Sequence, residues 1–283
     1  MCYCFRIVSD EYRLKTLVRI MRLYLEDDDQ VSAETFLNRA THLLPVAPPI
    51  GTQDPLLPIR LSIRLSQARI LESKRKFTEA AQRYLSLSNS MAIDVDDRIQ
   101  CLSQAIICSI LAPAGPLRIR LLSNLFIDLR SKELTQHYPL LERVHRGGFL
   151  TSAHVETFKT LLQPHHLAIL ADGKTTVLDR AMIEHNVLAA ADIYRVISIQ
   201  NLAKRVGVAE KGKGGIEEVI RGMVKEGRIK AEIDRVGGWI KLFKITTDQD
   251  SEQISRMDNK LNGIDVKQIF ELVQAISDKI KAL

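Results

Sequence analysis

Residues 196–245 constrain the fold of this chain more than any other stretch, because here the apolar spacing changes from purely helical to mixed. A short apolar segment at residues 196–199 leads into a small helix and a glycine-rich turn. A second helix follows, and Gly227 stands where a left-handed residue would end it. Its apolar residues have the spacing of one helix face: Ile216, Val219, Ile220, Met223 and Val224.

Two strand-like runs complete this stretch, at residues 229–233 and 239–245. The five residues that separate them, 234–238, have the length and glycine content of a β-hairpin connection. Strand, helix, turn, helix and hairpin, in this order, are the elements of a winged helix-turn-helix. Because five elements of suitable size must coincide, the pattern is specific.

The first third of the chain predicts paired amphipathic helices. A stretch with five prolines, residues 45–58, separates two pairs, and one common offset superimposes them: Arg22 falls on Arg69 and Ala33 on Ala80. A small alanine followed by a bulky residue three or four positions later is a packing pattern of tetratricopeptide-like hairpins. The sequence therefore predicts degenerate repeats, with an irregular helical bundle as the alternative.

Further helical segments follow, one at residues 134–144 that we expect to bend at Pro139, so the fold class is mostly α. We expect tetratricopeptide-like helical repeats at residues 11–162, then the winged-helix part at 163–247 with a lead-in helix at 177–195, then C-terminal helices at 248–283. Stacked hairpins need a neighbour or a cap, and the chain opens directly on a repeat helix. We therefore expect that N-terminal repeats are missing from this form.

The tail carries an apolar seam whose residues alternate in steps of four and three. Such a seam suits docking into a bundle with helices of other chains. The alternative is a tail that folds back on its own domain. The seam residues are Ile269, Val273, Ile276, Ile280 and Leu283.

Composition narrows the class of protein. The chain is 46% hydrophobic and 26% charged, which is ordinary for a soluble protein, and no run reaches the roughly 18–20 apolar residues that span a bilayer. Its four cysteines have no recognised metal spacing. We therefore expect no membrane partner and a reducing location, the cytoplasm and nucleus.

A net charge of +6 raises the possibility of a nucleic-acid partner, since residues 196–245 carry eleven Lys/Arg against six Asp/Glu. A DNA-reading helix, however, would present Glu217 and Glu218 to the phosphates first, so we do not expect one. We prefer an open sheet edge that accepts a strand from another chain. The strand expected to provide this edge comprises Ile229, Lys230, Ala231, Glu232 and Ile233.

Catalytic and metal motifs are weak. Residues 168–175 imitate a phosphate-binding loop, but Ala168 replaces its first glycine and no parallel sheet is expected. His165 and His166, with Asp172 nearby, lack further ligands at a matched spacing, so we interpret them as exposed polar residues. We expect no enzymatic activity, cofactor or metal. The loop at residues 164–176 is predicted to be exposed and mobile, with these three residues contacting a partner.

The order of helical repeats, winged helix and further helices resembles the PCI-domain family, which the proteasome lid, the COP-9 signalosome and initiation factor three share. Four segments are similar, more narrowly, to the fourth-subunit family of the COP-9 signalosome. The likeness covers nearly all of the chain from about Glu11. The segments are residues 22–29 (RLYLEDDD), 75–84 (RKFTEAAQRY), 178–186 (LDRAMIEHN) and 226–229 (EGRI).

The resemblance implies a non-catalytic scaffold in the complex that removes a ubiquitin-like modifier from cullins and so regulates cullin-RING ubiquitin ligases. Its implied partners are other PCI-domain subunits, metalloprotease-type subunits that perform the hydrolysis, and indirectly the cullin-RING ligase. It also implies that the 164–176 loop faces the catalytic pair of subunits. The alternatives are a PCI subunit of the proteasome lid or of initiation factor three, and a winged-helix nucleic-acid-binding protein.

Overall fold

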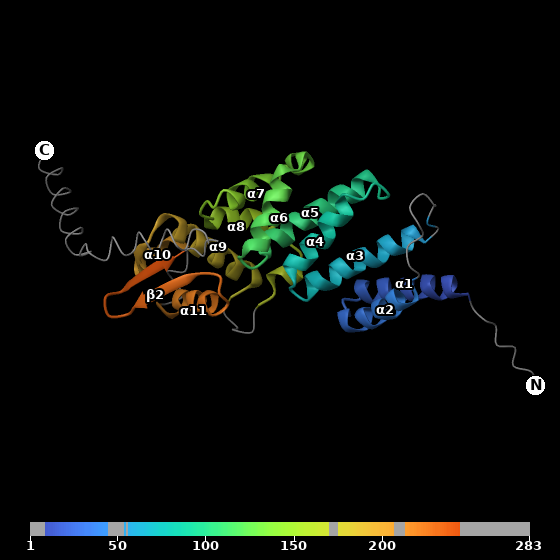
Figure 1. The fold of residues 1–283 in the computed structure, drawn as a ribbon, viewed down its shortest axis with the longest axis horizontal. Helices are drawn as coiled ribbons and strands as arrows, with labels where there is room; N and C mark the ends of the chain where they lie inside the picture. Colours follow the sequence, from blue (N-terminus) through green and yellow to red (C-terminus); the bar gives the residue numbers. More distant parts are fainter. Residues whose placement is uncertain (1–8, 45–53, 55, 170–174, 207–212, 244–283) are drawn as a thin grey trace, which may run out of the picture.

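The computed structural model describes residues 9–44, 54, 56–169, 175–206 and 213–243. In these ranges it contains eleven α-helices and one three-stranded sheet, so the expected mostly α class is confirmed. The molecule is elongated, with helical hairpins at one end and the winged helix at the other (Figure 1). No helix in the described part of the chain is long and apolar enough to cross a bilayer.

The first four helices form two hairpins that repeat each other. Helix α1 (Asp10–Glu26) pairs with α2 (Gln30–Leu43), and α3 (Leu57–Ser73) pairs with α4 (Phe77–Ser88). Both helices of the second hairpin begin 47 residues after their counterparts in the first. The offset expected from the sequence is therefore confirmed.

The repeat extends to side chains and to backbone conformation. Ala33 and Ala80, at equivalent positions, are both completely buried, as tight helix packing requires. Leu65 of α3 is apolar but 40% exposed. Helix α3 contacts α1, α2 and α4, so it buries two faces. Ile63 and Ile70 pack with the first hairpin, whereas Ala68 packs in the cluster that includes α4.

Seven further helical segments lead to the winged helix. Helix α5 lies at their centre and is buried over most of its length. The expected bend at Pro139 is wrong. Pro139 lies in the first turn of α7, where the backbone N–H groups have no partner within the helix, so its missing N–H costs no hydrogen bond. The segments are α5 (Val95–Leu111), α6 (Pro116–Ile127), η1 (Leu129–Glu133), α7 (Tyr138–His145), α8 (Ser152–Lys159), η2 (Pro164–Leu167) and α9 (Val177–Ile193).

The winged helix has the expected strand, two helices and hairpin in the expected order, and the expected turn between the helices falls on residues 207–212, outside the described residues. Gly227 ends α11 with φ +70°, and the backbone N–H groups of Gly227 and Arg228 bond back to Val224 and Met223, which is a Schellman motif. The three strands form an antiparallel sheet in the order β1-β3-β2. The elements are β1 (Val196–Ser198), α10 (Ile199–Val206), α11 (Lys213–Lys225), β2 (Lys230–Asp234) and β3 (Trp239–Phe243).

Helix α9 joins the helical hairpins to the winged helix because it contributes to two hydrophobic cores. Leu178 and Met182 pack with residues of α4 to α8, whereas Val187 and Ala190 pack inside the winged helix. Along α11 the expected apolar stripe is confirmed except at Val224, which is 39% exposed. The regional boundaries at 162 and 247 remain predictions, and the tail with its seam lies outside the described residues.

Candidate functional site

Strand β2 lies at one edge of the winged-helix sheet, with β3 as its neighbour (Figure 1). On its other side, β3 pairs with β1: the Leu242 N–H donates to the Arg195 carbonyl, and the Ile199 N–H to the Gly238 carbonyl, both at 2.9 Å. In an antiparallel sheet the backbone groups of successive residues point to alternate sides. The backbone groups of Lys241 and Phe243 in β3 therefore point toward β2.

This register fixes which groups of β2 are paired. Glu232 lies opposite Lys241 and Lys230 opposite Phe243, so their N–H and C=O groups bond to β3. The backbone groups of Ala231 and Ile233 point the other way, to the open edge. Their side chains are half-buried against the winged-helix core, which holds the strand in place. The edge thus offers four backbone groups that no described strand pairs with.

The hairpin beside this edge has an apolar tip. The Asp234 carboxylate accepts hydrogen bonds from the backbone N–H groups of Val236 and Gly237, both at 3.0 Å, and this closes the turn. The Val236 side chain is fully exposed, and Trp239 is 42% exposed. Apolar surface next to unpaired backbone is typical of a protein–protein contact rather than of a catalytic centre.

Helix α11, which would read DNA in a nucleic-acid-binding winged helix, has one face turned toward its own chain. A groove of about 1110 Å³ is lined by residues of α8, α9 and α11, and Gly215, Glu218 and Gly222 line the α11 side. Glu217 is held in ion pairs with Arg221 and Arg235, each at 3.3 Å. A duplex requires a protruding helix with free donors toward the bases, so this geometry does not favour DNA reading.

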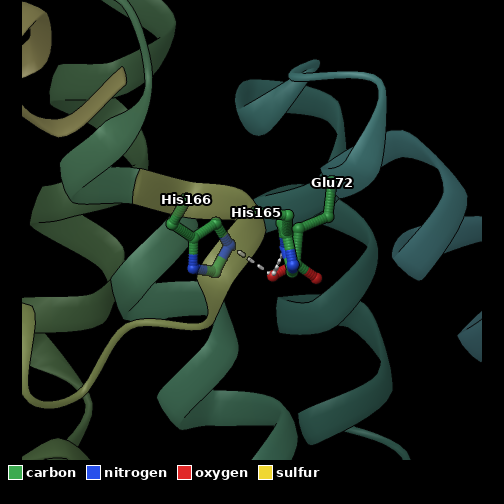
Figure 2. Close-up of side chains that lie close together, drawn as sticks. All are labelled: Glu72, His165 and His166. Carbon is green, nitrogen blue, oxygen red and sulfur yellow. Dashed lines mark hydrogen bonds and ion pairs between the residues drawn. The ribbon is translucent and has the colours of Figure 1, made fainter. Parts of the chain in front are cut away.

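A second candidate site surrounds Glu72 in the last turn of α3, where the side chain is buried (Figure 2). The Tyr84 hydroxyl donates to Glu72 Oε2 at 2.5 Å, and His166 Nε2 lies 2.8 Å from Glu72 Oε1. His165 Nε2 lies 3.4 Å from the same Oε1. Two adjacent imidazoles and one carboxylate therefore meet between α3 and η2.

Hydrogen bonds fix the protonation pattern of this cluster. His166 Nδ1 accepts from the Gln163 backbone N–H at 3.3 Å, so its proton is on Nε2 and is donated to Glu72. Burial disfavours ionisation of Glu72, but hydrogen bonds from His165, His166 and Tyr84 outweigh it and lower the pKa of Glu72 to about 2. Burial, followed by the charge of Glu72, raises the pKa of Tyr84. The cluster therefore contains an ionised carboxylate and a neutral phenol.

The interpretation of both histidines as exposed loop residues is wrong. His166 is completely buried in η2, and the His165 side chain is 34% exposed. The reason is Glu72, 94 residues before His166, which no local spacing rule connects to the histidines. Being buried, His166 is not available for the expected partner contact. That contact stays a prediction for His165 and for Asp172, which lies outside the described residues.

One signal in the sequence could have indicated Glu72. The 47-residue offset places it on Leu25, which is buried in the first hairpin. A carboxylate at a buried position of a repeat needs partners, because an unpaired buried charge is costly. The alanine and arginine matches between the repeats do not include this position.

Three further buried polar residues, which no sequence pattern indicated, lie in the middle of α9: Glu184, His185 and Asn186. The Asn186 amide bonds to both backbone groups of Leu150, at 2.8 and 2.9 Å. His185 Nε2 donates to the Gly148 carbonyl at 3.0 Å, and burial, together with the charge of Arg118, lowers the pKa of His185 to about 4. These bonds fix the segment before α8 against α9.

Comparison with known families divides the chain into two matched parts. The PCI domain family matches residues 154–244, which include α9 and the winged helix. The family described as PSMD12/CSN4, N-terminal, matches residues 3–96, which include both repeated hairpins. These matches agree with the order of elements in the structure.

Curated relatives match over nearly the whole chain, and each is named COP9 signalosome complex subunit 4. The relative from Emericella nidulans is 39% identical over 263 residues, which are 92% of this chain and 62% of the relative. The Neurospora crassa relative is 37% identical and the Arabidopsis thaliana relative 36%, over 98% and 92% of this chain. The chain spans 61% and 63% of those two relatives, so it is shorter than the proteins it matches.

Proposed function

Because the chain belongs to the PCI-domain family and is similar to COP9 signalosome complex subunit 4, we propose that it is a non-catalytic scaffold subunit of that complex. Its partners are then other PCI-domain subunits and metalloprotease-type subunits, and the latter carry out the removal of the ubiquitin-like modifier from cullins. The chain holds these partners in place and supplies no reacting group. Its contact with the cullin-RING ligase is indirect.

The open edge of β2 is the observation that supports this role best. The N–H and C=O groups of Ala231 and Ile233 would bond to a strand or extended segment of a neighbouring subunit. Each such bond stabilises the contact by about 0.5–1.5 kcal/mol net of solvation. The apolar tip at Val236, which is fully exposed beside this edge, would add side-chain contact.

The register of β2 on β3 allows a test that separates the open edge from the paired edge of the strand. Proline removes one backbone N–H, and its position in β2 determines which edge loses that donor. At Ala231 the lost N–H points to the open edge, where proline is tolerated. We expect Ala231→Pro to unfold at nearly the wild-type temperature and to lose co-purification with the other PCI subunits. Glu232→Pro removes a bond to β3 and should lower the unfolding temperature.

Glu232→Gln is the matched control on the same strand. It removes only an exposed ion pair with Lys241 at 3.5 Å and leaves the backbone unchanged, so it should assemble like wild type. Wild-type yield of the assembled complex with Ala231→Pro would show that β2 does not carry the contact. Failure of Glu232→Gln as well would assign the contact to side chains instead.

A further inference from the structure

We propose that Glu72, His165 and His166 form a binding site for a divalent cation of the zinc class. The three donor atoms lie within 4.8 Å of one another, and both imidazoles point at the same carboxylate oxygen (Figure 2). The proposal is independent of the scaffold role and of the β2 edge. It departs from the expectation of no metal, because Glu72, 94 residues from His166 in sequence, completes the cluster.

The donor set and its spacing suit zinc. Two imidazole nitrogens and one carboxylate oxygen are zinc ligands, with bonds of about 2.0–2.2 Å, and three protein ligands leave a fourth position for water. Two ligands at a tetrahedral angle are then roughly 3.3 Å apart. His165 Nε2 and Glu72 Oε1 are 3.4 Å apart. His166 Nε2, at 2.8 Å from that oxygen, must move away by about half an ångström.

The surroundings of Glu72 suit a bound cation. The Glu72 side chain is only 5% exposed, and in the described part of the chain its ion pairs are with these two histidines alone. A buried carboxylate needs partners that compensate its charge. A divalent ion held between Glu72 Oε1 and the two imidazoles would be such a partner.

The position of His165 favours the metal. His165 Nε2 is buried 3.4 Å from the Glu72 carboxylate, and within the described part of the chain this contact is not aligned as a good hydrogen bond. The rest of the His165 side chain is partly exposed, which gives an ion access and leaves room for a water ligand. The Tyr84 hydroxyl donates a hydrogen bond to Glu72 Oε2 and so leaves Oε1 as the ligand atom. Carboxylates that bind metals are commonly oriented by hydrogen bonds of this kind.

Coordination by His166 has a defined cost. Its proton must move from Nε2 to Nδ1, and the hydrogen bond from the Gln163 N–H is then lost. A site that must rearrange in this way exchanges its metal, in contrast to a preformed structural zinc site. When filled, it would fasten the second helical hairpin, through α3, to the η2 segment that precedes α9.

The test uses the full chain after treatment with a chelator, with Zn²⁺ alone as the probe. Cys2 and Cys4 are replaced by serine in every sample, because thiols bind zinc adventitiously. Isothermal titration should give one Zn²⁺ per chain, and Zn²⁺ should raise Tm. Both effects should persist in His42→Ala, since His42 is an exposed histidine of α2.

His165→Ala and Glu72→Gln are the two diagnostic variants. Each should weaken Zn²⁺ binding at least tenfold and abolish the shift in Tm. His165→Ala should fold, because the side chain is partly exposed and makes no well-formed hydrogen bond. Equal Zn²⁺ binding by wild type and His165→Ala would overturn the proposal. So would the absence of saturable Zn²⁺ binding by the wild-type chain.

Discussion

The Arg228 guanidinium donates to the buried Glu184 carboxylate at 2.6 Å, across 44 residues of sequence. This bond connects α9 to the segment between α11 and β2. Glu184 also accepts from Arg180 at 3.1 Å, one turn earlier on its own helix. The carboxylate therefore holds the winged helix in a fixed position on α9, and with it the direction in which the open edge of β2 faces.

Arg228→Ala should lower the free energy of unfolding by about 1–3 kcal/mol, because it leaves a buried carboxylate with one partner fewer. Urea unfolding measures the change. The matched control is Arg221→Ala, which removes an exposed arginine from its pair with Glu217 on α11 and should cost less than about 1 kcal/mol. Equal losses for the two variants would mean that the Glu184 bond adds nothing to stability.

The turns of the two hairpins have the same backbone strain. Asp28 and Arg75 are equivalent residues and have φ of +58° and +61°, a conformation that costs residues other than glycine about 1–2 kcal/mol. Arg75→Gly should therefore raise the free energy of unfolding by up to about 1 kcal/mol, since the greater freedom of glycine in the unfolded chain offsets part of the gain. Lys76→Gly, at φ −85°, should give no gain, which thermal unfolding can check.

Position 227 has the same backbone requirement, but it already carries glycine. With φ +70° Gly227 closes the Schellman motif after α11, and a Cβ there would have no atom of the described residues within 4 Å. Gly227→Ala should thus lower stability by about 1 kcal/mol through backbone strain alone. Urea unfolding without a measurable loss would show that the turn can relax to another conformation.

His185 predicts a loss of stability on acidification. Its pKa is lowered to about 4 in the folded chain, below the ordinary value of 6.5, so the unfolded chain binds the proton more readily. The stability that depends on neutral His185 is present above pH 6.5 and is lost as the pH falls toward 4. The free energy of unfolding should therefore decrease by roughly 2 kcal/mol between pH 7 and pH 5. His185→Gln should show a smaller loss over this range in urea unfolding. An unchanged pH dependence would assign it to other groups.

The apolar seam of the tail makes a prediction about assembly that rests on sequence alone. Side chains of this kind each contribute about 1.5–3 kcal/mol when buried, so the seam needs a covering surface. Val273→Asp combined with Ile276→Asp should leave the helical hairpins folded but abolish co-purification with partner subunits. Wild-type co-purification of this double variant would mean that the tail packs on its own domain.

The sequence determined the elements and their order, since these depend on local patterns. Two of these patterns are local: the helical spacing from Ile216 to Met223 and the turn at residues 234–238. The third is a repeat, in which Ala33 and Ala80 occupy the same position. Patterns of both kinds can be detected in a single sequence. Pro139 shows the limit of this reasoning. Proline both bends and begins helices, and only the structure decided which.

Tertiary packing decided what no local pattern encodes. Glu72 and His166 are 94 residues apart, and they meet because α3 packs on α4 while η2 folds back beside both. The open groups of Ala231 and Ile233 follow from the register of β2 on β3, which is fixed by long-range pairing. Buried polar contacts of this kind depend on which helices become neighbours, and that choice is made by the free energy of the whole core rather than by any segment of it.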